Sequence, residues 1–234
     1  MENPAEKHPD SAGRVRHIVW DWNGTLLDDL QAAVSAFNSL LRARSLPETD
    51  AAAYRAEFGF PARGMYERHG FDLAHEDWDA LARDFHAALR GDSSLKLQSG
   101  AREALETAKA RGLGQSVLSA LRQDFLECDL RRFGIDGFFE NVCGSDDLDG
   151  AEKTARGRIL AKSLALPPDE MVLVGDTLHD AEVAARCGMR CILVSCGHQN
   201  RERLLGAGAP VADDPLEAVL AAAELRRPAA TGNP

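Results

Sequence analysis

The sequence has no apolar run long enough to span a bilayer, and it does not start with a charged stretch followed by an apolar leader. It has only five cysteines, an odd number, and no two of them form a Cys-x-x-Cys pair. These absences speak against a membrane span, a disulfide framework and a thiolate zinc site. We therefore expect a cytoplasmic protein whose cysteines are small buried residues in a reducing compartment.

Positive charge is scarce as well. The chain holds 27 Lys and Arg against 37 Asp and Glu, which gives a formal net charge of −10. A chain with this balance does not attract nucleic acid or an anionic membrane non-specifically, so we expect neither as a partner. A small anionic substrate can still be drawn to a local cation. The composition gives no indication of the oligomeric state.

What the sequence has instead is an alternation of short β-branched runs with helical patterns. Its 234 residues, 44% of them hydrophobic, can bury a sizeable core. We expect strands at 15–20, 115–119, 138–143, 171–175, 190–194 and 210–212, and helices at 30–44, 100–111, 122–133, 154–166, 180–187, 201–205 and 216–225. Strands that alternate with helices predict an α/β fold with a doubly wound parallel sheet covered on both faces.

The stretch from Pro47 to Leu95 has a different character. Its apolar residues fit three or more short helices, and no strong strand pattern occurs in it. We predict an all-helical insertion between the first two strands, although helices that simply pack on the sheet would give the same pattern. The predicted division is a disordered tail at 1–13, a core at 14–30 and 96–225, a helical module at 31–95 and a loose tail at 226–234.

Two of the expected strands lead directly into an acid. Asp21 follows the first strand, and Asp176 follows the strand at 171–175. Ligands of open parallel sheets bind at the carboxyl ends of the strands, so we expect these acids at a binding edge. A carboxylate there can ligate a hard cation or attack an electrophile. Gly24 ends the first strand pattern, and the pair Asp28-Asp29 can cap the helix that follows.

Four motifs follow one another along the chain, three of them at strand ends: Asp21-Trp22-Asn23-Gly24-Thr25-Leu26, Ser119, Lys153 and Gly175-Asp176-Thr177-Leu178-His179-Asp180. In this order they resemble the motifs of the haloacid dehalogenase superfamily, which is mostly phosphatases, and especially its phosphoglycolate-phosphatase-like members. The resemblance covers about residues 15 to 225. It implies a Rossmann-like core with an inserted helical cap that closes over the active site.

The resemblance implies a nucleophile and a metal site. Asp21 would form an aspartyl-phosphate, and Mg²⁺ would be held by Asp21, the main-chain carbonyl of Asn23 and Asp176, with Asp180 acting directly or through water. The physical argument agrees with this assignment. Three bare carboxylates would repel a dianionic phosphoryl group, and Mg²⁺ prefers oxygen ligands and bridges to phosphate oxygens. We therefore expect Mg²⁺ as the cofactor and a small phosphorylated molecule as the substrate.

The same resemblance implies which residues hold the phosphoryl oxygens. Thr25, Ser119 and Lys153 would do so, with Lys153 also countering the carboxylates. Position alone leaves alternatives open, because Ser119 can equally be a turn residue at a strand end. Arg156 and Arg158 lie near Lys153 in the sequence and could take its place.

In capped members of the superfamily, side chains of the cap select the substrate. Here that points to the region from Phe58 to Arg63, with Arg63 or Arg55 as a cation for an anionic substrate tail. Each arginine could equally lie on a solvated helix surface.

One residue departs from the pattern. Most phosphatases of the superfamily carry a second Asp two residues after the nucleophile, which protonates the leaving oxygen and then activates water, and here that residue is Asn23. General acid–base help contributes about 10²–10⁴-fold, so an amide should slow ester hydrolysis. The leaving group could need little protonation, another residue such as His179 could act, or the enzyme could be slow.

The departure also keeps other functions open. The chain could be a phosphate-binding or sensing protein that has lost turnover. It could be a 2-haloacid dehalogenase, since halide needs no proton, although such members do not need the metal site that Asp176 and Asp180 resemble. A phosphonate-cleaving member would need a cap lysine, and residues 47–95 contain none.

Overall fold

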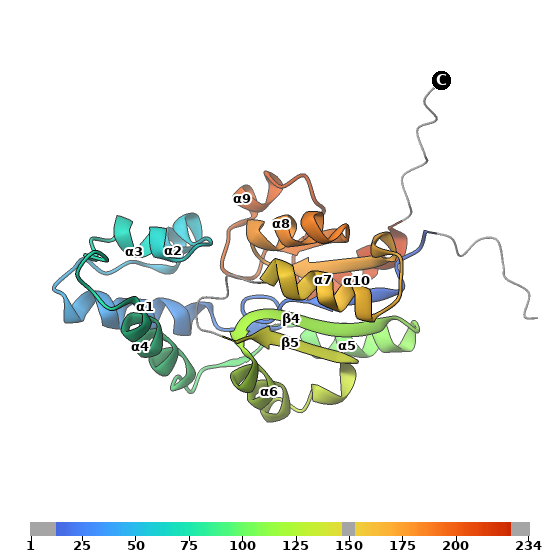
Figure 1. Cartoon of the computed structure of the whole chain (residues 1–234), viewed down its shortest axis with the longest axis horizontal. Coiled ribbons are helices and arrows are strands. Elements are labelled where there is room, and N and C mark those ends of the chain that lie inside the picture. The colour runs from blue at the N-terminus through green and yellow to red at the C-terminus, as the bar shows by residue number, and fades with distance from the viewer. Residues whose placement is uncertain (1–12, 147–152, 226–234) are drawn as a thin grey trace, which may run out of the picture.

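The structure is a computed structural model that describes residues 13–146 and 153–225. The chain forms two lobes, a larger one built on a sheet and a smaller one made of helices (Figure 1). Apart from residue 13, the tails predicted at 1–13 and 226–234 lie outside the described residues. In the part of the chain that is described, no helix combines the length and the apolarity that crossing a bilayer requires.

The larger lobe contains one six-stranded parallel sheet. In spatial order its strands are β5 (Asn141–Ser145), β4 (Gly114–Arg122), β1 (His17–Trp20), β6 (Met171–Gly175), β7 (Arg190–Val194) and β8 (Val211–Ala212). The strand order reverses at β1, where the chain first builds outward on one side and then on the other. The predicted doubly wound parallel sheet is thereby confirmed.

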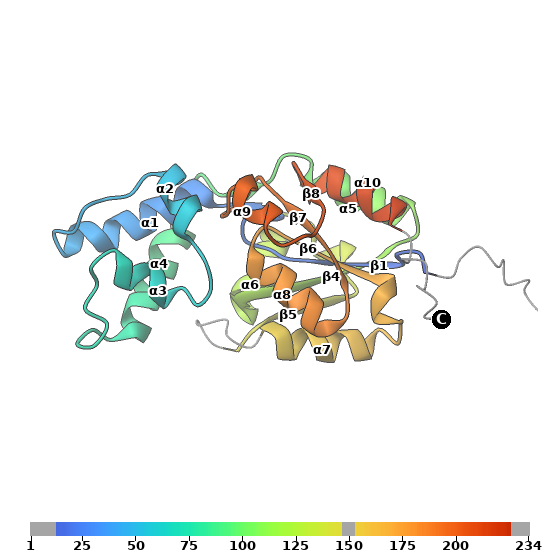
Figure 2. The same ribbon diagram turned by 90° about the horizontal axis from the view of Figure 1, so that it is seen from above.

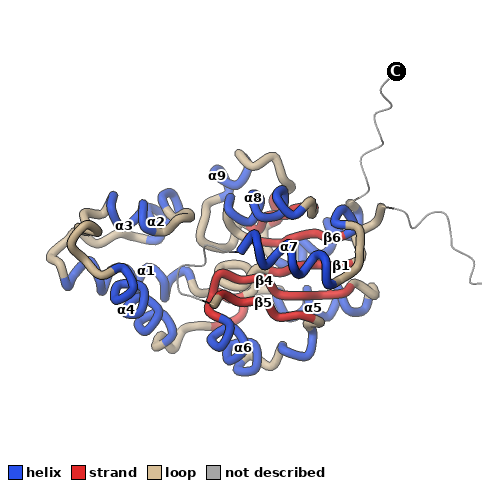
Figure 3. The backbone as a smooth tube through the Cα atoms, viewed as in Figure 1, coloured by secondary structure: helices blue, strands red, loops and turns tan. Residues whose placement is uncertain are grey.

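Helices cover both faces of this sheet (Figures 2 and 3). Val19 packs in one apolar cluster with residues of α7 (Lys153–Ser163) and α8 (Leu178–Cys187). Its neighbours Ile18 and Trp20 point to the opposite face, where they share a cluster with residues of α5 (Ala101–Ala110), α6 (Gln123–Arg132) and α10 (Pro215–Glu224). This alternation is the two-residue period of a strand that is buried on both faces.

The smaller lobe consists of the four helices α1 (Leu30–Ala43), α2 (Ala51–Glu57), α3 (Arg63–Arg68) and α4 (Trp78–Arg90). Phe37 of α1 lies at its centre and contacts the rings of Tyr54, Tyr66 and Phe71. The predicted all-helical insertion is present, and we refer to this lobe as the cap. The boundaries at residues 31 and 95 stay a prediction.

The two chain crossings between the lobes are joined by a short antiparallel pair, β2 (Leu27–Asp28) with β3 (Lys96–Leu97). The sequence did not predict this pair, because two residues a strand are too few to show a period. This pair joins the end of the loop that follows Asp21, called the Asp21 loop below, to the segment where the chain returns from the cap. The loop is therefore anchored by β1 at its start and by β2 at its end.

Several expected boundaries were wrong. Strand β4 does not end at Ser119 but continues to Arg122 after a register shift against β5, so the hydroxyl residue did not mark the strand end. The strand expected at 138–143 begins only at Asn141, because Asp136–Phe138 forms a turn of 3₁₀-helix. A second such turn, Pro168–Glu170, precedes β6, and the short helix α9 (Arg201–Leu205) lies where it was expected.

Candidate active site

The acids at the strand ends meet, as the sequence predicted. Strands β1 and β6 are neighbours with Trp20 opposite Val174, so Asp21 and Asp176 emerge side by side at the carboxyl edge of the sheet. Asp180, in the first turn of α8, joins them. One carboxylate oxygen from each of the three residues lies within 4.8 Å of the others, and all three residues are buried. This group of three is called the acid cluster below.

Asp180 is held in place by the start of its own helix. Thr177 precedes α8 as the N-cap residue, and its side chain and that of Asp180 form a capping box. Oδ2 of Asp180 accepts hydrogen bonds from the backbone N–H of Thr177 at 3.0 Å and from its hydroxyl at 2.6 Å. The other oxygen, Oδ1, remains directed at the acid cluster.

Lys153 supplies the cation at the acid cluster. Its ammonium donates to Oδ1 of Asp21 at 2.5 Å and to Oδ1 of Asp180 at 2.6 Å, with only 3% of the lysine exposed. Arg156 instead donates to the main-chain carbonyl of Ser119 at 3.3 Å, and Arg158 to that of Arg186. Of the three cationic residues that the sequence left open, Lys153 is therefore the one that contacts the acid cluster.

The two hydroxyl residues have different positions. Thr25 lies inside the cluster, where its hydroxyl is 3.2 Å from Oδ2 of Asp21 and 3.3 Å from Oδ1 of Asp176. The hydroxyl of Ser119 accepts a hydrogen bond from the N–H of Leu121 at 3.0 Å, within the irregular part of β4. Thr25 therefore contacts the acid cluster, whereas the Ser119 hydroxyl accepts from its own strand.

Two glycines leave the space that the Asp176 carboxylate occupies. A Cβ on Gly24, whose φ is +76°, would lie 2.1 Å from Oδ2 of Asp176, and a Cβ on Gly197 would lie 2.2 Å from the same oxygen. That oxygen also accepts a hydrogen bond of 2.6 Å from the backbone N–H of His198. The close approach of two backbone segments explains why both positions are glycine.

The charges of the acid cluster are only partly balanced. Burial raises the pKa of Asp21 to about 6 and that of Asp176 to about 8, against the opposing effects of Lys153 and His198 respectively. Burial acts in the same direction on Asp180, but there the Lys153 ammonium holds the pKa of the carboxyl below its usual range. One lysine among three buried carboxylates leaves negative charge that a further cation would stabilise.

Asn23 points its side-chain amide at Asp29. The amide nitrogen donates to Oδ2 of Asp29 at 2.7 Å, and the backbone N–H of Gly24 donates to Oδ1 at 2.8 Å. Asp29 occupies the N-cap position of α1, but its side chain makes no capping hydrogen bond there. The sequence allowed Asp28 or Asp29 to cap this helix, and Asp29 is the N-cap residue, but its carboxylate accepts from Asn23 and Gly24 and not from the helix.

His198 also contacts Asp29, and the sequence did not predict it as a residue of the site. It is 5% exposed, and its Nε2 lies 3.0 Å from Oδ1 of Asp29. Burial alone would lower the pKa of His198, but the carboxylate of Asp29 raises it to about 9, so the two form a buried ion pair. A single histidine in a loop carries no periodic signal, and only the fold shows that it returns to the Asp21 loop.

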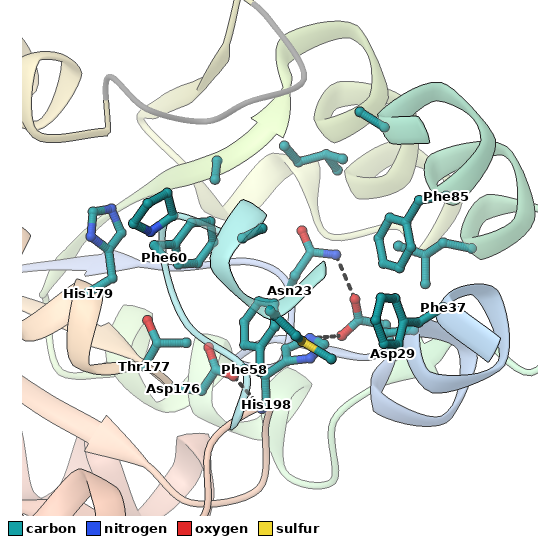
Figure 4. A pocket seen from close by; sticks show the side chains of 18 of the residues that line it. Asn23, Asp29, Phe37, Phe58, Phe60, Phe85, Asp176, Thr177, His179 and His198 are labelled. Atoms are coloured by element: carbon teal, nitrogen blue, oxygen red, sulfur yellow. Dashed lines mark hydrogen bonds and ion pairs between the residues drawn. The ribbon is translucent and has the colours of Figure 1, made fainter. Parts of the chain in front are cut away.

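A cavity of about 420 Å³ opens from the acid cluster toward the cap. Figure 4 shows Asp176 and Thr177 on one side of Asn23 and the rings of Phe37 and Phe85 on the other. Of the substrate-binding candidates, Arg63 lines the cavity, with its guanidinium carbon 5.1 Å from the centre of the Trp78 ring. Arg55 is not among the lining residues.

Two of the remaining candidates lie at the junction of cap and core. The Arg55 guanidinium donates to the main-chain carbonyls of Ser195 and Gln199, so it joins the two lobes. His179 lines the cavity, and its ring lies 4.9 Å from that of Phe60. Burial lowers the pKa of His179, which favours the neutral imidazole.

The comparison with known families shows to which family the chain belongs. The profile of the haloacid dehalogenase-like hydrolase family matches residues 18–194. The chain belongs to this family. The matched residues include the loop after Asp21 and the segment from Asp176 to Asp180. The predicted members of the acid cluster therefore all lie within the match.

Individual relatives of this hydrolase are described as phosphatases. A probable phosphatase IndB of Dickeya dadantii is 28% identical over 88% of this chain and 92% of its own length. A phosphoglycolate phosphatase of Caulobacter vibrioides is 30% identical over 77% of this chain and 79% of its own length. The crystal structure of a protein described as a predicted phosphatase from Clostridium acetobutylicum has the same fold, with a TM-score of 0.76 and 21% identity over 91% of this chain and all of the other.

Proposed function

We propose that this hydrolase is a Mg²⁺-dependent phosphatase that hydrolyses a small phosphorylated metabolite through an aspartyl-phosphate on Asp21. The observation that carries the proposal is the acid cluster at the carboxyl edge of the sheet, with Lys153 bound to two of its members. The phosphatase names of the relatives support the same reaction class.

The donor set fits a hard divalent cation. Asp21, Asp176 and Asp180 offer only oxygen ligands and are buried, and burial raises the pKa of Asp21 and Asp176, an effect that a bound cation would oppose. We propose that these three residues and the carbonyl of Asn23 hold Mg²⁺, which when bound supplies positive charge to the phosphoryl oxygens.

Asp21 then acts as the nucleophile. One of its oxygens bonds to phosphorus while the bond from phosphorus to the leaving oxygen breaks, and the electron pair of that bond stays with the leaving oxygen. Water afterwards hydrolyses the acyl phosphate and releases inorganic phosphate. Lys153 and Thr25 flank the two oxygens of Asp21 and are therefore placed to hold phosphoryl oxygens. A role for Ser119 in the same task stays a prediction.

Asn23 cannot serve as the general acid in ester hydrolysis. Because its amide nitrogen faces Asp29, its amide oxygen is directed elsewhere, and an oxygen acceptor cannot donate a proton to a leaving alkoxide. His179 lies in the same cavity with a lowered pKa, so it could accept a proton from water but is a poor donor near neutral pH. We propose that proton transfer limits turnover of poor leaving groups.

Hydrolysis of an aryl phosphate, 4-nitrophenyl phosphate, tests the proposal, because this leaving group needs little protonation. Wild type should hydrolyse it with Mg²⁺ and not with EDTA, and Asp21→Ala should lose at least about 10²-fold in kcat/KM. Activity that survives Asp21→Ala would overturn the proposal. Thermal stabilisation by Mg²⁺ and phosphate without any turnover would favour a phosphate-binding protein, and metal-independent halide release from 2-chloropropionate would favour a dehalogenase.

A further inference from the structure

We propose that the substrate is a phosphate monoester whose leaving group carries an uncharged aromatic ring, which the cap binds. This inference rests on the proposed phosphatase function and names the class of substrate for that site. It is carried by the composition of the cavity wall beyond the acid cluster, where rings and aliphatic side chains replace the charged groups that a second anionic group would need.

The cap contributes a wall of aromatic rings to the cavity. Phe37, Phe58, Phe60, Trp78 and Phe85 all line it. Phe58 stacks on Tyr54 with 5.2 Å between ring centres, and Phe60 meets Phe58 edge to face at 5.6 Å. Rings held at these distances present flat apolar faces, and a bound ring can stack on them or meet them edge to face.

This wall is continuous with the phosphoryl site. Asp21, Lys153 and Asp176 line the same cavity as the cap rings. The ring of Phe58 lies 5.1 Å from that of His198, and in the view of Figure 4 the rings of Phe37 and Phe85 lie on the other side of Asn23 from Asp176. A phosphoryl group on Asp21 therefore directs its leaving group toward the rings. The volume of about 420 Å³ is large enough for a phosphoryl group with a bicyclic aromatic substituent.

The charges around the cavity disfavour a second anionic group. Residues 31–95 contain seven arginines and no lysine. Six of these arginines contact an acid or a main-chain carbonyl: Arg42, Arg44, Arg55, Arg68, Arg83 and Arg90. Among the described lining residues beyond the acid cluster, His198 is already paired with Asp29, and Glu182 adds negative charge.

Arg63 is the one arginine of the described cap that lines the cavity, and it is exposed. Its guanidinium lies over the ring of Trp78, which is a cation–π contact at the rim and not an inward-facing anion site. The role of Arg63 as the cation for an anionic tail stays a prediction, and in the present inference Arg63 is part of the aromatic wall.

A matched pair of substrates tests the inference. 2-Phenylethyl phosphate and 2-carboxyethyl phosphate are both esters of primary alcohols, so their leaving groups need similar protonation and differ in the ring or the carboxylate. We expect kcat/KM to favour the phenyl ester by at least about 10-fold, because the ring leaves water for an apolar wall. Equal rates, or faster hydrolysis of the carboxylate, would overturn the inference while leaving the phosphatase intact.

A substitution in the wall should change this ratio. Phe85→Lys places a cation among the rings and should shift the preference toward the carboxylate by at least about 10-fold. Phe139→Lys is the matched control, since Phe139 is also partly buried against the core but lies outside the lining. The ratio of two substrates on one protein is insensitive to partial loss of folded enzyme. An unchanged ratio in Phe85→Lys, or an equal shift in Phe139→Lys, would contradict the assignment.

Binding separates failure of this inference from failure of the proposed function. If neither alkyl ester is hydrolysed, hydrolysis of 4-nitrophenyl phosphate decides the phosphatase proposal, which fails if that ester is not hydrolysed either. The non-hydrolysable 3-phenylpropylphosphonate and 3-carboxypropylphosphonate, titrated calorimetrically in the presence of Mg²⁺, then still decide the preference of the pocket. Tighter binding of the phenyl compound by at least about 10-fold supports the inference, and equal or weaker binding overturns it. Should Phe85→Lys fail to fold, Phe85→Leu provides the second variant and should lower the phenyl preference.

Discussion

The side-chain amide of Asn23 donates a 2.7 Å hydrogen bond to Asp29, whose other carboxylate oxygen lies 3.0 Å from Nε2 of His198. The resemblance predicted a second acid at position 23, where this chain has an amide whose nitrogen contacts the Asp29 carboxylate. An Asp at position 23 would bring two carboxylates together in a buried place. The Asn23 amide is thus part of a hydrogen-bonded group with Asp29 and His198. An Asp at position 23 would require this group to change.

We predict that Asn23→Asp destabilises the protein. The lost hydrogen bond and the new repulsion between carboxylates should cost roughly 1–3 kcal/mol, which lowers Tm by several degrees in a chain of this length. The double variant Asn23→Asp with Asp29→Asn restores a donor facing an acceptor, but it also removes the charge that pairs with His198, so it should recover only part of this loss. Calorimetric melting of the two variants and wild type measures the effect, and a single variant as stable as wild type would contradict it.

The same double variant should hydrolyse alkyl phosphates faster than wild type. Its carboxylate at position 23 can carry the proton that an amide cannot, with a gain of at most about 10²–10⁴-fold. In wild type, a burst of leaving group before a slow steady state would show that breakdown of the aspartyl-phosphate limits turnover, and the double variant should shorten or abolish it. Stopped-flow measurement with 4-nitrophenyl phosphate resolves the two phases. No burst in wild type and no gain in the variant would mean that another residue already does this work.

Lys153→Met should weaken both the fold and the reaction. Removal of the ammonium leaves Asp21 and Asp180 buried without their partner, at a cost of about 3–5 kcal/mol in the free energy of unfolding without metal. Mg²⁺ should return part of this stability, and kcat/KM should fall by at least about 10²-fold. Lys162→Met, near the exposed end of the same helix, is the control. Urea unfolding in EDTA that gives equal midpoints for Lys153→Met and wild type would contradict the role of Lys153.

Gly24→Ala should remove activity for a steric reason. The added Cβ would lie 2.1 Å from Oδ2 of Asp176, so the carboxylate or the loop must move away from the acid cluster. Gly112→Ala is the matched control, because Gly112 has a similar φ of +72° but nothing within 4 Å of the added atom. Both variants should lose about 1–2 kcal/mol to backbone strain, and only Gly24→Ala should lose Mg²⁺-dependent turnover. Full activity of Gly24→Ala would show that the Asp176 position tolerates displacement.

Acid should destabilise the fold through His17, away from the active site. The His17 ring is buried at the start of β1 with Nε2 2.8 Å from the Ser116 hydroxyl, and burial lowers its pKa, although Glu140 partly opposes the effect. The unfolded chain takes up a proton near pH 6.5 while the folded ring resists it. The stability linked to His17 is therefore fully present above about pH 6.5 and declines as the pH falls below that value toward the lowered folded pKa.

The variant His17→Gln should show a smaller loss of stability between pH 7.5 and pH 5.5 than wild type. The difference should reach a few tenths to about 1 kcal/mol. His75→Gln serves as the control, since the His75 side chain is exposed. Urea midpoints at the two pH values measure the effect. An equal slope in wild type and His17→Gln would assign the acid sensitivity to other groups.

The sequence alone determined the class of fold and the members of the acid cluster. Buried β-branched runs such as 171–175 and the acids that follow them are local patterns, and parallel strands bring their carboxyl ends to one edge of the sheet whatever the loops do. Asp21, Asp176 and Asp180 could therefore be expected together before any coordinates existed. The helical periods likewise predicted a cap without strands.

Only the tertiary structure decided which groups surround that cluster. Lys153 prevailed over Arg156 because the start of α7 points the lysine at Asp21. The Asp29–His198 pair joins residues 169 positions apart, and no local pattern connects such positions. The aromatic wall exists because rings of α1 and α4 meet those of Phe58 and Phe60, which lie between α2 and α3, at one cavity. Such contacts depend on how separate elements pack, and the sequence pattern of each element is the same whether or not they meet.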